Sequence, residues 1–283
     1  MKPDFSIQER EIAAAILADL EESRAAIAVE KLRDLKNNLY TAIPDKKRQS
    51  RGITWVLMRL GLLLTAACRD LEYVRAASLA LLEAMKIEDR LVGVPIYMMA
   101  EFGKTHPEET LNFFFTTCGS GQWEVREFAA SGFRRVIKTN REVALPWLNQ
   151  CAKNESPYVR RFTSETLRPV VENRWLNDAP YPSLDILRPL FCEPHSYPRT
   201  SVGNNLSDLA RRNPDLILSI VQELVASGNK NSFWIAYRAC RNMVKKDPER
   251  IMDIFGADEY HYKDRHFYRS HHPEKKPIEQ SGT

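Results

Sequence analysis

The sequence predicts an all-α protein built from repeated helical hairpins, and three observations lead to this prediction. Only 11 of the 283 residues are glycine. Alternating apolar and polar runs between turn residues, which are typical of strands, are hard to find. Four segments resemble one another at a nearly constant interval. Repeats of this length are typical of helix pairs that stack side by side into a solenoid.

The four repeated segments lie between residues 123 and 248. Val125, Val159, Pro198 and Ser232 superpose, at intervals of 34, 39 and 34 residues. The segments are WEVREFAASGFRRVIKTN, PYVRRFTSETLRPVVEN, SYPRTSVGNNLSDLARRNP and NSFWIAYRACRNMVKKDP. Each is predicted to form the first helix of a hairpin, and 141–153 and 215–227 are predicted to form second helices. Asn-Pro at 213–214 and Asp-Pro at 247–248 indicate helix starts, with a capping side chain before a proline in the first turn.

The N-terminal part is predicted to contain more helices of the same kind, over 9–40, 69–86 and 90–117, in a less clear register. The most apolar run, 52–68, carries Arg59 and is shorter than the roughly 20 residues that span a bilayer. We expect a buried helix there. The predicted organisation is a helical repeat domain over 1–256, clearest over 121–256, followed by a polar, mobile tail over 257–283.

Composition limits the classes of function. The chain is 43% hydrophobic and 28% charged, which is ordinary for a soluble globular protein, and its net charge of +4 permits an anionic partner without requiring one. Five scattered cysteines without a CxxC pair predict neither a disulfide framework nor a zinc site, and they favour a reducing cytoplasm. The N-terminus lacks the order of a signal peptide. We expect no membrane span, metal or other cofactor. His261, His266, His271 and His272 in the tail fit no metal-ligand spacing.

The helix predicted over 123–138 has two distinct faces. Val125, Phe128, Ala129, Gly132, Phe133 and Val136 cluster on a buried stripe. The opposite face carries Trp123, Glu127, Ala130, Ser131, Arg134 and Lys138. A carboxylate therefore shares an exposed face with an indole ring and two cations.

The same face is predicted to continue through the stacked repeats. Equivalent positions carry Arg161, Ser164, Glu165 and Arg168, then Gly203, Asn204 and Ser207, then Trp234, Tyr237, Arg238 and Arg241. Arginines, small residues and aromatic rings together suit a groove that holds phosphates and stacks on bases. The alternative is an ordinary solvated face, with basic residues stabilising helix C-termini, tryptophans packing on neighbouring repeats, and an acid such as Asp208 bonded to an adjacent repeat.

Two segments then resemble a known family. SPYVRRFTSETLRP (156–169) and SYPRTSVGNNLSDLARRNPDLIL (196–218) are similar to the paired repeat motifs of AlkC-type DNA alkylation repair glycosylases. WEVREFA resembles their Glu-Phe-Ala segment and also the Trp-x-x-x-acid pattern of the related AlkD type. The resemblance covers about residues 85–256. Asn204 and Asn205 stand where AlkD-type members carry an aromatic residue, which favours the AlkC type.

The resemblance implies a HEAT-like solenoid whose concave face binds duplex DNA. It implies hydrolysis of the N-glycosidic bond of alkylated purines, such as 3-methyladenine, without full extrusion of the base. Glu127 and Asp208 match the active-site acids of the family. Trp175 lies near an aromatic position of the lesion site, and Arg160, Arg161 and Arg168 match residues that hold the DNA backbone. From the shared face, Trp123, Arg134, Trp234, Arg238 and Arg241 are further candidates for DNA contacts.

Two hypotheses follow from the sequence. The first is a monomeric, monofunctional glycosylase that acts on double-stranded DNA containing alkylated bases. The second is a non-catalytic HEAT-like scaffold that binds nucleic acid or a protein partner along the same face.

Overall fold

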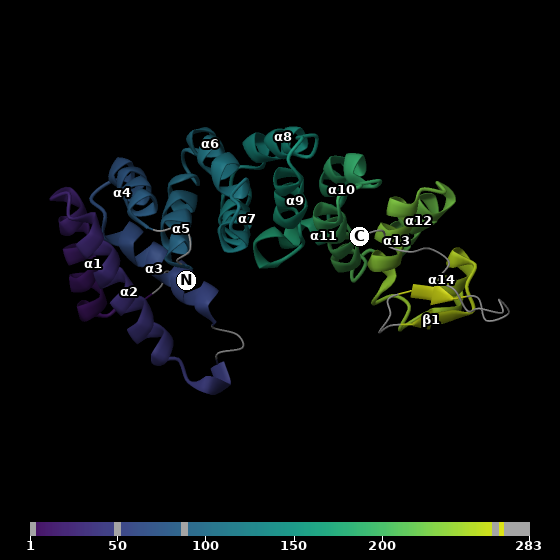
Figure 1. Cartoon of the computed structure of the whole chain (residues 1–283), viewed down its shortest axis with the longest axis horizontal. Helices are drawn as coiled ribbons and strands as arrows, with labels where there is room; N and C mark the ends of the chain where they lie inside the picture. The colour runs from purple at the N-terminus through teal and green to yellow at the C-terminus, as the bar shows by residue number, and fades with distance from the viewer. Residues whose placement is uncertain (1–3, 48–51, 86–89, 262–265, 269–283) are drawn as a thin grey trace. The chain divides into compact units, whose positions relative to one another are not determined.

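The computed structural model describes residues 4–47, 52–85, 90–261 and 266–268 (Figure 1). The all-helical repeat prediction is confirmed over these residues, apart from one short pair of strands. The chain divides into two compact units, 1–144 and 145–283. No helix in the described ranges is both long and apolar enough to cross a bilayer.

The first unit contains the helices up to residue 144. They are α1 (Ile7–Glu21), α2 (Ala25–Thr41), η1 (Asp45–Lys47), α3 (Ile53–Ala67), α4 (Leu71–Ala84), η2 (Arg90–Val92), α5 (Gly93–Phe102), α6 (Pro107–Cys118), α7 (Trp123–Ile137) and the start of α8 (Arg141–Cys151). Local chemistry sets the helix starts: Ser6 and Glu9 form a capping box on α1, and Asp70 accepts a hydrogen bond from the Tyr73 amide on α4.

Helix α5 is the centre of the first unit. Nine of its ten residues are buried, and it packs against α3, α4 and α7. The expected buried helix over 52–68 is α3, whose Arg59 forms an ion pair with Glu9 at 2.8 Å. The apolar run over 52–68 thus packs its buried side chains against α5, the centre of the first unit.

The second unit contains the remaining elements. They are α9 (Pro157–Thr166), η3 (Val171–Asn177), α10 (Tyr181–Leu187), η4 (Arg188–Leu190), α11 (Ser196–Leu209), α12 (Pro214–Ala226), α13 (Lys230–Cys240), α14 (Pro248–Phe255), β1 (Glu259–His261) and β2 (His266–Tyr268). The first helices of successive hairpins, α9, α11 and α13, pack side by side (Figure 1). This is the arrangement that the repeat interval predicts.

The helix starts predicted at the two prolines are confirmed, because α12 begins at Pro214 and α14 begins at Pro248. Only one of the two expected capping side chains forms its capping hydrogen bond. Asp247 accepts a hydrogen bond from the Arg250 amide at 3.3 Å, but the Asn213 side chain makes no capping bond. Its amide donates instead to the Asn177 carbonyl at 3.0 Å, which ties the start of α12 to the preceding repeat.

The expectation of a tail without regular structure from residue 257 is wrong for a few residues. Glu259–His261 pairs with His266–Tyr268 in antiparallel register, and the Tyr260 ring lies 5.6 Å from the ring of Tyr237. Aromatic residues spaced for a hairpin, which the sequence analysis treated as polar tail, account for the difference. The rest of the predicted tail, with His271 and His272, lies outside the described residues.

Candidate functional site

The outward face of α7 carries the first candidate residues. The stripe from Val125 to Val136 is buried as predicted, and Trp123 on the opposite face is 55% exposed. Glu127 and Arg134 are partly exposed on that face. Trp123, Glu127 and Arg134 line one pocket of about 290 Å³. The spacing of these residues along one helix therefore brings them together.

The orientation of α7 is fixed at both ends. Near its start, the guanidinium of Arg126 donates to the carbonyls of Ser120 and Gly121 at 2.6 and 2.9 Å. Near its end, Arg135 forms an ion pair with Glu101 of α5 at 2.6 Å. These contacts at both ends fix the orientation of the helix that carries Glu127 into the lining of the pocket.

The pocket has a cationic and an apolar side that the sequence analysis did not find. Arg90, from η2, lines it beside Phe128, and its guanidinium lies 3.9 Å from Glu124. Arg90 comes from a short turn outside the predicted repeats, so no periodic pattern marks it. Two carboxylates (Glu124 and Glu127), an indole ring and two guanidinium groups share this pocket, and such a set suits a ligand with both aromatic and charged parts.

One predicted part of this face is wrong. Ala130 is 1% exposed, and Ser131 accepts a hydrogen bond from the Tyr97 hydroxyl at 2.9 Å. The equivalent residues Ser164 and Glu165 in the next repeat are also buried. Helices pack closely on this flank, so Ala130 and Ser164 fill contacts between helices rather than opening a surface. Ser131 is partly exposed and lines the pocket beside Glu127, as predicted.

Asp208, the second candidate acid, lies in an ion-pair network between α9 and α11. Arg168 contacts one oxygen of the Asp208 carboxylate at 2.6 and 2.9 Å, and Arg211 approaches the other at 3.5 Å. Arg168 also bonds to Glu165 at 3.2 Å. The alternative role weighed for Asp208, a bond to the arginine of an adjacent repeat, is therefore present in the structure.

Glu165 is the most buried carboxylate of this network. Ser201 donates to it at 2.6 Å, and Arg161 lies 3.6 Å away. Burial alone raises the pKa of the Glu165 carboxyl, but the charges of Arg161 and Arg168 outweigh burial and hold that pKa below its ordinary value of 4.5. The sequence analysis placed Glu165 on the exposed face and missed this role.

The two other candidate arginines of α9 also have internal partners. Arg160 forms a two-contact pair with Glu193, at 2.7 and 2.8 Å. This pairing raises the pKa of Arg160 and fixes its planar group. Arg161 lies over the ring of Tyr197, 4.3 Å from its centroid.

The candidates on α13 pack against α11. Arg238 and Arg241 both donate to the Asn204 side-chain oxygen, at 2.9 and 2.7 Å. Trp234 lies between two guanidinium groups, 5.3 Å from Arg199 and 5.5 Å from Arg238. The expectation that Trp234 is a large exposed ring is wrong, because it is half-buried by these stacked cations.

Trp175 lies in η3, directly after α9, and is half-buried rather than exposed. The adjacent Asn173 is fully buried and donates to the Thr166 carbonyl at 2.6 Å, which fixes this turn. Within the described part of the chain, no group of three or more His, Cys, Asp or Glu side chains is arranged to hold a metal ion.

Comparison with known proteins gives the following findings. No protein-family model matches the sequence. The chain is 27% identical over 166 residues to YhaZ, an uncharacterised protein of Bacillus subtilis strain 168. That match covers 56% of this chain and 43% of YhaZ, so the chain spans less than half the length of this curated relative.

Two solved structures are similar in fold. The crystal structure of AlkD2 from Streptococcus mutans superposes with a TM-score of 0.57 at 19% identity, covering 75% of this chain and 97% of AlkD2. The Pseudomonas fluorescens alkylpurine DNA glycosylase AlkC, solved on DNA containing an abasic site analogue, superposes with a TM-score of 0.53 at 18% identity. That superposition covers 90% of this chain and 69% of AlkC. The chain therefore has the helical-repeat fold of AlkC and AlkD2.

Proposed function

We propose that this chain is a monofunctional DNA glycosylase that hydrolyses the N-glycosidic bond of alkylated purines such as 3-methyladenine. One observation carries the proposal. Trp123 and Glu127, one helical turn apart, line an open pocket in a fold shared with an alkylpurine DNA glycosylase that has been solved on DNA. The spacing matches the Trp-x-x-x-acid pattern that the sequence analysis singled out.

The chemistry suits an exposed carboxylate. An adenine alkylated at N3 carries a positive charge, so it leaves readily with the electron pair of the bond to C1′. The sugar then develops positive charge, which a carboxylate stabilises while it orients the water that adds to C1′. Glu127 fills this role in the proposal. The Trp123 ring attracts the cationic base by about 0.5–2 kcal/mol, which favours damaged over neutral bases.

The remaining candidates are assigned to the DNA. Arg134, Arg160, Arg161, Arg168, Arg238 and Arg241 would contact phosphates, and Trp175 and Trp234 would contact bases or sugars. Several of these arginines already have internal partners that fix their orientation. A guanidinium has five donors, so a paired arginine retains N–H groups for a phosphate. We expect a monomer, in the cytoplasm, acting on duplex DNA.

A second candidate function rests on Asp208. Its carboxylate is held by Arg168 and Arg211, as expected for a residue that joins two repeats. This favours the alternative of a non-catalytic scaffold that binds nucleic acid or a protein partner.

The two functions are separated by base release from methylated duplex DNA. We expect release by the wild type, and a loss of at least about a hundredfold in Glu127→Gln, which keeps the size of the side chain and removes its charge. Glu109→Gln, on an exposed site of α6, is the matched control and keeps full activity. Binding to abasic-site DNA should persist in both variants.

Two results would count against the enzyme. Unchanged release by Glu127→Gln would exclude this carboxylate as the catalytic group. No release by the wild type at any salt concentration, with DNA binding retained, would favour the scaffold.

A further inference from the structure

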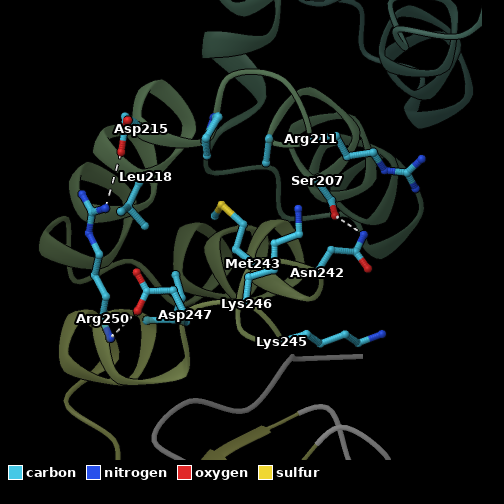
Figure 2. Close-up of a pocket in the computed structure, with 13 residues that line it drawn as sticks. Ser207, Arg211, Asp215, Leu218, Asn242, Met243, Lys245, Lys246, Asp247 and Arg250 are labelled. Atoms are coloured by element: carbon cyan, nitrogen blue, oxygen red, sulfur yellow. Dashed lines mark hydrogen bonds and ion pairs between the residues drawn. The ribbon is translucent and has the colours of Figure 1, made fainter.

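A second pocket lies in the second unit, at the ends of the last two hairpins. It is formed by the end of α11, the start of α12, the turn after α13 and the start of α14, and its volume is about 500 Å³ (Figure 2). None of the residues that the proposed function assigns to DNA lines it. A volume of this size suits a small organic ligand.

The floor of this pocket is apolar. Ala210, Pro214, Leu218, Met243 and Ile251 supply it, from four consecutive segments of the repeat. Figure 2 shows Leu218 and Met243 among the side chains that surround the open space. Burial of such a surface by a ligand removes apolar area from water, which is favourable by about 25 cal/mol per Å².

The rim of the pocket is cationic. Arg211, Lys245 and Lys246 are exposed there. The acidic residues of the pocket are already engaged: Asp215 lies 3.4 Å from the Arg250 guanidinium, and Asp247 caps α14. In the described part of the chain, the Lys246 ammonium group has no side-chain partner. The Lys246 ammonium group therefore stands beside an apolar floor without an ion-pair partner among the described residues.

We propose that this pocket binds an amphipathic anion, with an apolar body of about the size of a fused two-ring system or a ten-carbon chain and one carboxylate, sulfonate or phosphate group. The body lies on the floor formed by Leu218 and Met243. The anionic group faces Lys246 and the neighbouring cations. This site goes beyond the proposed function and does not depend on it.

The test uses the full chain and the probe 8-anilinonaphthalene-1-sulfonate, whose fluorescence rises in an apolar site. We expect saturable binding of one probe per chain. Lys246→Glu should weaken it at least tenfold, and Met243→Gln should weaken it severalfold by making the floor polar. Lys153→Glu, an exposed residue in the turn before α9, is the matched control with the same change of charge and should bind as the wild type does. Circular dichroism and thermal unfolding check that each variant is folded.

Competition then distinguishes the source of the ligand. Displacement of the probe by sodium decanoate indicates a free aliphatic acid. Displacement only by the peptide acetyl-Ala-Ala-Leu-Phe, with its terminal carboxylate, indicates a peptide end. Equal affinity in Lys246→Glu, Lys153→Glu and the wild type, or the absence of saturable binding to the folded chain, would overturn the proposal. Whether the protein releases bases from DNA does not affect the interpretation of probe binding or of its displacement.

Discussion

The Asp208 carboxylate is the residue whose role the structure changes most. Arg168 and Arg211 hold it at the junction of two repeats. We expect Asp208→Asn to lower the free energy of unfolding by about 1–3 kcal/mol, because Arg168 then keeps a largely desolvated charge with a weaker partner. Urea unfolding measures this change. Unchanged stability of Asp208→Asn would show that the pair is not structural.

Glu165 predicts how the stability of the fold depends on pH. Its folded pKa lies below 4.5, so its contribution is fully present above that pH and is lost as the pH falls through the lower folded pKa. We expect the wild type to lose more stability between about pH 5 and pH 3 than Glu165→Gln, which has no group to protonate. Thermal unfolding over this pH range measures the difference. Parallel curves for the two proteins would show that Glu165 is not linked to folding.

These residues also show what the sequence predicts at this scale. Helical spacing correctly placed Trp123 and Glu127 on one exposed face, because the number of residues between two side chains sets the angle between them around the helix axis. The sequence left open that Asp208 bonds an adjacent repeat, but it identified neither Arg168 as the partner nor the pairing of Arg160 with Glu193. Such partners lie on different helices, and their contact depends on how far each helix is shifted along its neighbour.

Helices α11 and α13 approach each other closely at Gly203. A Cβ atom added at Gly203 would lie 2.8 Å from the Cβ atom of Arg238, which is too close for a carbon pair. We expect Gly203→Ala to destabilise the protein by about 1–3 kcal/mol, because the two helices must move apart. Gly121→Ala is the control, since no atom lies within 4 Å of its added Cβ. Equal unfolding midpoints of the two variants would contradict the close approach.

The helices themselves were predictable to a large extent. The interval between Val125, Val159, Pro198 and Ser232 correctly identified α7, α9, α11 and α13, and Pro214 and Pro248 marked the starts of two second helices. The short η3 and η4 turns were not predicted. Their sequences carry no helical period, and η3 is fixed by a buried contact, the hydrogen bond from Asn173 to the Thr166 carbonyl.

Over the whole molecule, binding to DNA should depend strongly on salt. If the six candidate arginines contact phosphates, each releases about 0.9 counterions, and affinity falls roughly 1,000-fold between 50 and 200 mM salt. Fluorescence anisotropy with a labelled duplex measures the slope. A salt-independent affinity would show that phosphates are not the ligands and would favour a protein partner.

The organisation of the whole chain was only partly predictable. The sequence predicts a single repeat domain over 1–256, whereas the chain divides into two compact units after Ala144, within α8. Composition is similar on both sides of Ala144, so no linker marks this boundary. The strands at Glu259–His261 and His266–Tyr268 were likewise not predicted, because each is three residues long and too short to show an alternating pattern.

The burial of α5 has a consequence for synthesis of the chain. Its apolar surface is covered by α3, α4 and α7, and α7 ends about 35 residues after α5. A ribosome adding 5–20 residues per second needs about 2–7 seconds for that length. During this interval α3 and α4 are already synthesised but the surface of α5 that faces α7 has no cover, so chaperone capture and aggregation compete with folding until α7 emerges.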